Sequence, residues 1–220
     1  MGTQVDLKPT LKFLTALKRN NNRTWFKAHR AEYEAASLAF EGFVGALIDE
    51  LRPTEGLGGL TAKDCIFRIY RDIRFSKDKT PYKTHMGAYI APGGRKLMKM
   101  GYYVQVSPGD SMIAGGLHEP EPKQLDKFRQ TVARDATPFR KIIGAKTFRD
   151  YFGEIGGEKL KTAPRGYPKD HPEIDLLRMK QITAHHPMPD DELLSKDVVK
   201  KTVAGFRMMK PFLSYLGSIR

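Results

Sequence analysis

Residues 101–118, GYYVQVSPGDSMIAGGLH, contain the features that decide the fold. The runs GYYVQV and SMIAGGLH flank the turn signal PGD (108–110), a pattern typical of a tight β-hairpin. A further strand candidate, MGAYIA (86–91), is followed by a second turn signal at 92–94. Together with strand character that begins at Cys65, these segments predict an antiparallel sheet of about four strands.

On both sides of this sheet, apolar residues recur at intervals of three and four, as in amphipathic helices. One such pattern covers about residues 24–51, and another begins near Asp197. The chain has 220 residues, an ordinary size for one domain. The order of helices, strands and helices predicts a single α+β domain. Its expected parts are helices at 7–52, the sheet at 64–118, and helices and loops at 121–220 within a domain spanning 1–220.

The strand candidate at 66–75 introduces the sequence FRIYRDIRFSKDKTPYK, residues 67–83. Because successive side chains of a strand point to opposite faces, its two faces differ in character. The mostly apolar face carries Phe67, Ile69, Ile73 and Phe75, with Arg71 among them. The polar face carries Arg68, Tyr70, Asp72 and Arg74. A carboxylate in such a row can hold guanidinium planes in fixed orientations by bidentate pairing.

Positive charge is concentrated around this segment. Between Lys63 and Lys99 there are ten Lys or Arg residues and three Asp or Glu residues. Local acids are therefore too few to neutralise the bases, although ion pairs that only solvate a sheet face are an alternative explanation. The formal net charge of the chain, +13, also favours anionic partners such as nucleic acid or phosphorylated metabolites.

We interpret this segment as an anion-binding site, because binding residues concentrate in loops that follow rigid elements. Asp72 is expected to orient arginines or to act in proton transfer, and Tyr82 to donate a hydrogen bond; these are the candidate catalytic residues. The expected ligand-binding cations are Arg68, Arg71, Arg74, Lys79 and Lys83.

A second basic cluster lies in a glycine- and proline-rich segment at 153–172 and just beyond it. Arg165 is its candidate ligand-binding residue, since the adjacent Gly166 allows the backbone to approach a ligand. The alternative is an ordered loop whose lysines are merely solvated.

The sequence predicts no metal site, because none of its six histidines has the spacing of a zinc site. Asp72 and Asp78 are conceivable Mg²⁺ ligands, but with so many cations nearby Asp72 is interpreted as an arginine orienter. Phosphate-binding glycine motifs are absent, and the sequence leaves open whether a cofactor is bound. A single cysteine, Cys65, and the lack of a secretory signal or a long apolar run predict a cytoplasmic protein without a membrane span.

The pattern Arg68-x-x-Arg71-Asp72-x-Arg74-Phe75, followed by Asp78-Lys79-x-x-Tyr82, resembles the signature of an uncharacterised bacterial family, domain of unknown function 2461. The resemblance extends over nearly the whole chain and includes NNRTWF, GYYVQVSPG, GGLHEPEP and LKTAPRGYPKDHPEIDLLRMK. It implies no reaction, since the activity of that family is not established.

Three functions follow as hypotheses. The first is binding of an anionic, phosphate-bearing small ligand, by an enzyme or a non-enzymatic protein. The second is a nucleic-acid-binding or processing module that uses the same basic face together with Tyr103. The third is an interaction protein whose basic patch meets an acidic partner. The sequence predicts no oligomeric state.

Overall fold

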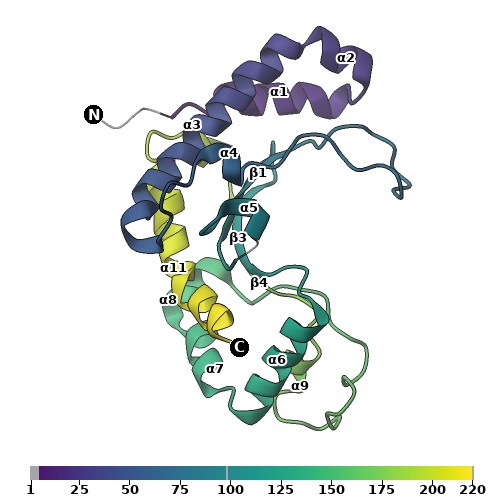
Figure 1. Ribbon diagram of the computed structural model, residues 1–220, viewed down its shortest axis with the longest axis vertical. Coiled ribbons are helices and arrows are strands. Elements are labelled where there is room, and N and C mark those ends of the chain that lie inside the picture. Colours follow the sequence, from purple (N-terminus) through teal and green to yellow (C-terminus); the bar gives the residue numbers. More distant parts are fainter. Residues whose placement is uncertain (1–4, 98, 220) are drawn as a thin grey trace. The chain divides into compact units, whose positions relative to one another are not determined.

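The computed structural model describes residues 5–97 and 99–219 (Figure 1). Over these residues the chain forms eleven helices and a four-stranded sheet with the strand order β1-β2-β3-β4. This confirms the α+β class, with helices before and after an antiparallel sheet. The strands are β1 (Met86–Ile90), β2 (Tyr102–Val106), β3 (Ser111–Leu117) and β4 (Ile182–Met188).

The contacts group the chain into two compact units. The first contains the described residues up to Ile113 together with Pro187–Ala204, and the second contains Ala114–His186 and the described residues from Gly205 onward. A single domain over 1–220 stays a prediction. The first unit contains the helices α1 (Lys8–Arg19), α2 (Arg23–Ala28), α3 (Arg30–Glu55), α4 (Ala62–Cys65), α5 (Gly94–Leu97) and α10 (Asp190–Leu193). The second contains α6 (Pro122–Arg134), α7 (Thr137–Gly144), α8 (Lys146–Phe152) and α9 (Ile174–Leu177), while α11 (Val198–Ser218) contributes to both.

The helix expected at 24–51 is divided at His29. This residue leaves the helical region, and both its backbone N–H and its ring Nδ1 lie within hydrogen-bonding distance of the Trp25 carbonyl, at 3.0 and 2.9 Å. A second helix then begins at Arg30 and continues through Pro53 to Glu55. It ends at Gly56, whose left-handed backbone (φ 60°) is the usual conformation of a residue just past a helix.

The predicted β-hairpin is present. The Asp110 N–H donates to the Ser107 carbonyl at 2.9 Å, and the Ser111 hydroxyl donates to the same carbonyl at 2.8 Å. The carboxylate of Asp190, in α10, accepts a hydrogen bond from the Gly109 N–H at 3.1 Å and so holds the turn from outside. Strands β1 and β2 pair antiparallel from Met86↔Val106 to Ile90↔Tyr102.

The fourth strand is β4 (Ile182–Met188), whereas the sequence predicted a strand at 66–75. That prediction is wrong for regular structure, since α4 ends at Cys65 and only isolated bridges occur before β1. His185 and His186 both lie within β4. Pro187 obscured this strand in the sequence; β4 is the last strand in the sheet order, a place where proline is tolerated.

The core of the second unit is aromatic. Ring centroids of Phe139 lie 5.3 Å from Phe128 and 6.0 Å from Phe212, which in turn lies 5.5 Å from Phe148. All four side chains are almost completely buried. The helices α6, α7, α8 and α11 therefore share one hydrophobic core in this unit.

Gly116 in β3 provides a test of the packing in the second unit. Its φ is +121°, and a Cβ atom would lie 2.2 Å from the Ile182 carbonyl oxygen. Gly116→Ala is therefore expected to lower the free energy of unfolding by about 1–3 kcal/mol, measured by urea denaturation. Gly144→Ala is the control, because no atom lies within 4 Å of a Cβ at that helical position. Equal stability of the two variants would contradict the close approach at Gly116.

Candidate functional site

The segment from Ile66 to Ala88, which follows α4 and includes the first residues of β1, forms a two-armed loop that we call the basic ribbon. Figure 1 shows it extending away from β1 and from the helices of the first unit. Its arms are antiparallel and are joined by the bridges Ile66↔Ala88 and Tyr70↔Tyr82. The Lys83 N–H donates to the Ile69 carbonyl at 2.8 Å, and the Arg71 N–H to the Pro81 carbonyl at 3.0 Å. The ribbon thus has strand-like pairing without a regular ladder.

A bulge explains why the ladder is not regular. Between the two bridges the outgoing arm advances from Ile66 to Tyr70, whereas the returning arm needs two more residues to pass from Tyr82 to Ala88. The chain bends at Thr84 and His85, where these additional residues are accommodated. Bulges change the direction of neighbouring side chains and are common beside binding sites.

The bulge places Lys83 and His85 among aromatic and cationic groups. The Lys83 ammonium lies 5.5 Å from the ring centroid of Phe67, whose ring lies 6.4 Å from that of Tyr103. Burial, and then the charge of Arg68, lower the pKa of Lys83. The pKa of His85 is also lowered, mainly by burial and further by Lys83, against an opposing effect of the Asp110 carboxylate. We call Phe67, Arg68, Lys83, His85 and Tyr103 the stem cluster.

Tyr103 is held in place by β1 and by the hairpin. Its hydroxyl donates to Gln105 Oε1 at 3.1 Å, and Gln105 Nε2 donates to the Asp110 carbonyl at 3.0 Å. A Cβ atom at Gly87 would lie 2.6 Å from the Tyr103 hydroxyl, so this position leaves room for the phenol. Burial raises the pKa of Tyr103 to about 12, and the group is therefore protonated at neutral pH.

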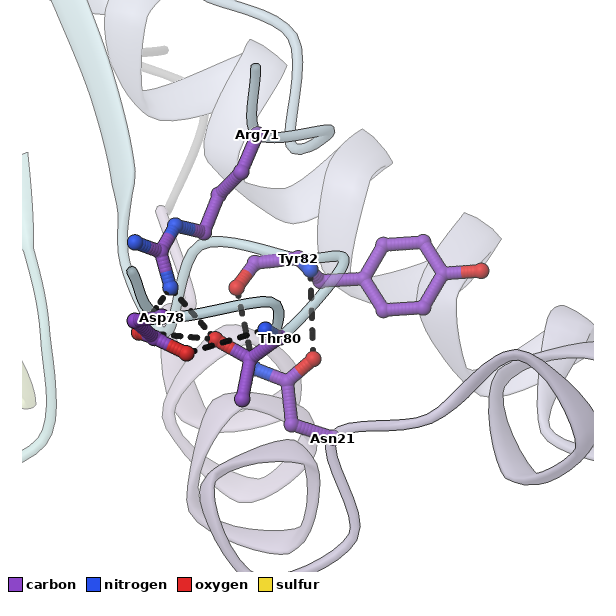
Figure 2. A network of polar contacts seen from close by, with 5 residues as sticks. All are labelled: Asn21, Arg71, Asp78, Thr80 and Tyr82. Carbon is purple, nitrogen blue, oxygen red and sulfur yellow. Dashed lines mark hydrogen bonds and ion pairs between the residues drawn. The ribbon is translucent and has the colours of Figure 1, made fainter. Parts of the chain in front are cut away.

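Arg71 is paired within the ribbon. Its guanidinium donates hydrogen bonds to the Asp78 carboxylate and to the Thr80 hydroxyl (Figure 2). Asp78 also accepts from the Thr80 N–H at 2.9 Å and from the Thr80 hydroxyl at 3.0 Å. Arg71, followed by the bonds from Thr80, lowers the pKa of Asp78 to about 2. Arg71, the cation predicted on the apolar face, therefore joins the two arms of the ribbon, and its charge is balanced by Asp78.

Arg74 and Asp72 form a second pair. Arg74 Nε and Nη2 donate to the two carboxylate oxygens of Asp72 at 3.0 and 2.7 Å, and the Arg74 N–H adds a bond of 3.2 Å. The pKa of Asp72 is lowered, chiefly by the Arg74 side chain, and the pKa of Arg74 is raised by the same bond. This is the geometry of an arginine-orienting carboxylate. Unlike these arginines, Lys79 bonds to the backbone: its ammonium donates to the Ile73 carbonyl at 2.9 Å.

Tyr82 anchors the ribbon to the N-terminal helices. Its ring is buried and stacks on Phe26 of α2, with centroids 4.0 Å apart and planes 12° apart. Asn21 Nδ2 donates to the Tyr82 carbonyl at 2.9 Å, and Asn21 Oδ1 accepts from the Tyr82 N–H at 3.1 Å. Figure 2 shows the phenol ring directed away from Arg71, Asp78 and Thr80. The structure thus separates the Tyr82 ring from the cations with which the sequence grouped it.

Of the predicted ligand-binding residues, Arg68 and Lys83 lie near each other, and the charge of Arg68 also lowers the pKa of Asp72. Across the described part of the chain, neither forms an ion pair, whereas Arg71 and Arg74 both do. Arg165 belongs to the second unit, where it is exposed in a turn closed by the Tyr167 N–H and the Pro164 carbonyl at 3.2 Å. Its role in binding stays a prediction.

Sequence reasoning missed His85, because its position depends on the bulge. Gly87 beside it was the available signal, since a strand glycine often marks a bulge or a close approach. No group of three or more His, Cys, Asp or Glu side chains suited to a metal ion occurs among residues 5–97 and 99–219. Within the same residues, no helix is both long enough and apolar enough to cross a membrane.

The anchoring role of Asn21 can be tested by Asn21→Ala. This change leaves the N–H and carbonyl of Tyr82 without their partners, so the free energy of unfolding is expected to fall by about 1–3 kcal/mol in urea denaturation. Asn20→Ala is the matched control, because the Asn20 side chain makes an exposed bond to the Ala16 carbonyl. It is expected to change stability by less than about 0.5 kcal/mol. Equal effects at the two positions would refute the anchor.

The pairing of Arg71 with Asp78 predicts a specific titration. In carbon NMR, the Asp78 carboxyl is expected to titrate near pH 2, because Arg71 stabilises its charged form. Below that pH the carboxylate is protonated and the ion pair is lost. Arg71→Ala should raise the midpoint toward the ordinary value of about 3.9. Asp72 is the internal control, since its partner is Arg74. An unchanged Asp78 midpoint would show that Arg71 is not its partner in solution.

Comparison with protein families agrees with the family resemblance of the sequence. Residues 9–215 match the family described as conserved hypothetical protein, DUF2461. Comparisons with curated proteins and with solved structures gave no significant match. Since the match covers almost the whole sequence, the chain belongs to the family of domain of unknown function 2461.

Proposed function

We propose that this chain binds a phosphate-bearing anionic ligand at the stem cluster, with Arg68 and Lys83 as its cationic contacts. One observation supports this above all. Arg68 lies near enough to lower the pKa of Lys83, and neither residue forms an ion pair among the residues described, although the charge of Arg68 also lowers the pKa of Asp72. The other arginines of the basic ribbon already have acidic partners.

The electrostatics of the cluster favour an anion. A partly buried ammonium beside a guanidinium is destabilised both by lost hydration and by like-charge repulsion. A phosphate placed between them would offset both effects, and arginine is well suited to bidentate phosphate contacts. Strongly perturbed titratable groups also tend to occur at functional sites.

Tyr103 and His85 add polar groups beside these cations. Tyr103 is protonated at neutral pH, and its hydroxyl already donates to Gln105, so its oxygen is available as an acceptor. His85 is half-buried with a lowered pKa, which favours the neutral imidazole. A neutral imidazole next to a bound phosphate could exchange a proton with it. If the protein is an enzyme, His85 is therefore the candidate for proton transfer. Asp72 instead orients Arg74, and Tyr82 anchors the ribbon to Asn21 and Phe26.

Thermal unfolding in the presence of anions tests the proposal. Inorganic phosphate, pyrophosphate and adenosine monophosphate are expected to raise the melting temperature progressively with concentration, relative to chloride at equal ionic strength. Arg68→Gln and Lys83→Met should each weaken this stabilisation by about tenfold in apparent affinity, since each removes one charged contact. Methionine preserves the packing on Phe67.

Lys12→Gln is the matched control, because Lys12 is an exposed lysine of α1 outside the ribbon. It changes the net charge by the same amount and should leave the phosphate response unchanged. If all three variants respond like the wild type, the stem cluster is not the binding site. If no phosphate compound raises the melting temperature, the proposed function is wrong.

A further inference from the structure

The end of the basic ribbon exposes an aromatic side chain. We call residues 72–80 the ribbon tip. Phe75, within it, is 95% exposed, more than any other large hydrophobic residue in the described ranges. Ile73 is half-buried, so the tip presents a single large apolar group. Exposure of a phenylalanine ring to water is unfavourable, and a ring displayed in this way suits a partner with its own flat or apolar surface.

The tip is internally bonded. Arg74, held by Asp72 through three hydrogen bonds, places its guanidinium 5.8 Å from the centroid of the Phe75 ring. The Lys79 ammonium donates to the Ile73 carbonyl. The network of Arg71, Asp78 and Thr80 closes the loop below it. These contacts restrain the backbone that carries Phe75, which reduces the ordering cost of binding.

The charges around Phe75 indicate an anionic partner. The ribbon contains only two acidic residues, Asp72 and Asp78, and both are paired with arginines. Lys77 is exposed and forms no ion pair within the described part of the chain. Further down, Tyr70 is 46% exposed and Arg68 is exposed as well. Two exposed aromatic rings, Tyr70 and Phe75, therefore lie between the exposed cations Arg68 and Lys77 along the ribbon.

We propose that the basic ribbon binds single-stranded nucleic acid, with a base stacked on Phe75 and backbone phosphates on Lys77 and the stem cluster. The inference rests on the proposed function and names the class of the phosphate-bearing ligand. Cationic grooves with exposed aromatic rings bind single strands because every base has a face that can stack. A membrane surface fits less well, since insertion requires several apolar groups at one end, whereas Tyr70 lies in the stem.

Fluorescence anisotropy with two labelled strands tests this. One is an oligothymidylate of about 15 nucleotides, and the other is an abasic strand of the same length, with the same phosphates but no bases. Phe75→Ala is expected to weaken binding of the oligothymidylate by about tenfold and to leave binding of the abasic strand unchanged. Arg68→Gln and Lys83→Met should weaken binding of both strands and reduce its salt dependence.

Leu38→Ala is the matched control, because Leu38 is an apolar side chain of α3 that is 72% exposed. It should bind both strands like the wild type. Equal binding of the two strands, with no effect of Phe75→Ala, would overturn base stacking and leave the proposed function intact if the Arg68 and Lys83 variants still weaken the complex. Binding of neither strand, together with no phosphate response, would overturn both. Phe75-dependent binding to phosphatidylserine vesicles alone would also overturn the inference.

Discussion

The two hydrogen bonds between Asn21 and the backbone of Tyr82 are the constraint on which the candidate site depends. They connect the link between α1 and α2 to a segment more than sixty residues later, and the stack of Tyr82 on Phe26 seals the same contact. A loop as long as the basic ribbon has a large conformational entropy. With its returning arm fixed at Tyr82, the bulge that follows can hold Lys83 and His85 in defined positions.

The cations of the ribbon have two different roles: some stabilise the loop itself, and others remain for a partner. Arg71 and Arg74 are compensated by Asp78 and Asp72, and Lys79 is bonded to a backbone carbonyl. These contacts shape the loop. The charges left for a partner are Arg68, Lys77 and Lys83. The number of cations in the sequence therefore overstates the charge available for binding, and the pairing within the ribbon determines which residues remain.

Much of the fold could be predicted from the sequence, because its signals are local. The hairpin follows from the turn at 108–110, and the N-terminal helices follow from their apolar spacing. The two errors had physical causes that periodicity does not report. Pro187 concealed β4, because proline is tolerated only at the edge of a sheet. The alternation at 66–75 suggested a strand, although two extra residues in the opposite arm disrupt its pairing. The candidate site could be predicted from the sequence only as a basic segment; its division into paired and unpaired cations required side-chain geometry.

The length of the bulge determines which side chains lie on each of the ribbon's two surfaces. Since side chains alternate with a period of two, an insertion of one residue would exchange the surfaces of the arm beyond it, whereas an insertion of two keeps them in phase. The returning arm contains two additional residues. The number of residues therefore keeps the alternation in phase on the two sides of the bend at Thr84 and His85. An insertion of a single residue into this arm is accordingly expected to exchange the two surfaces beyond it.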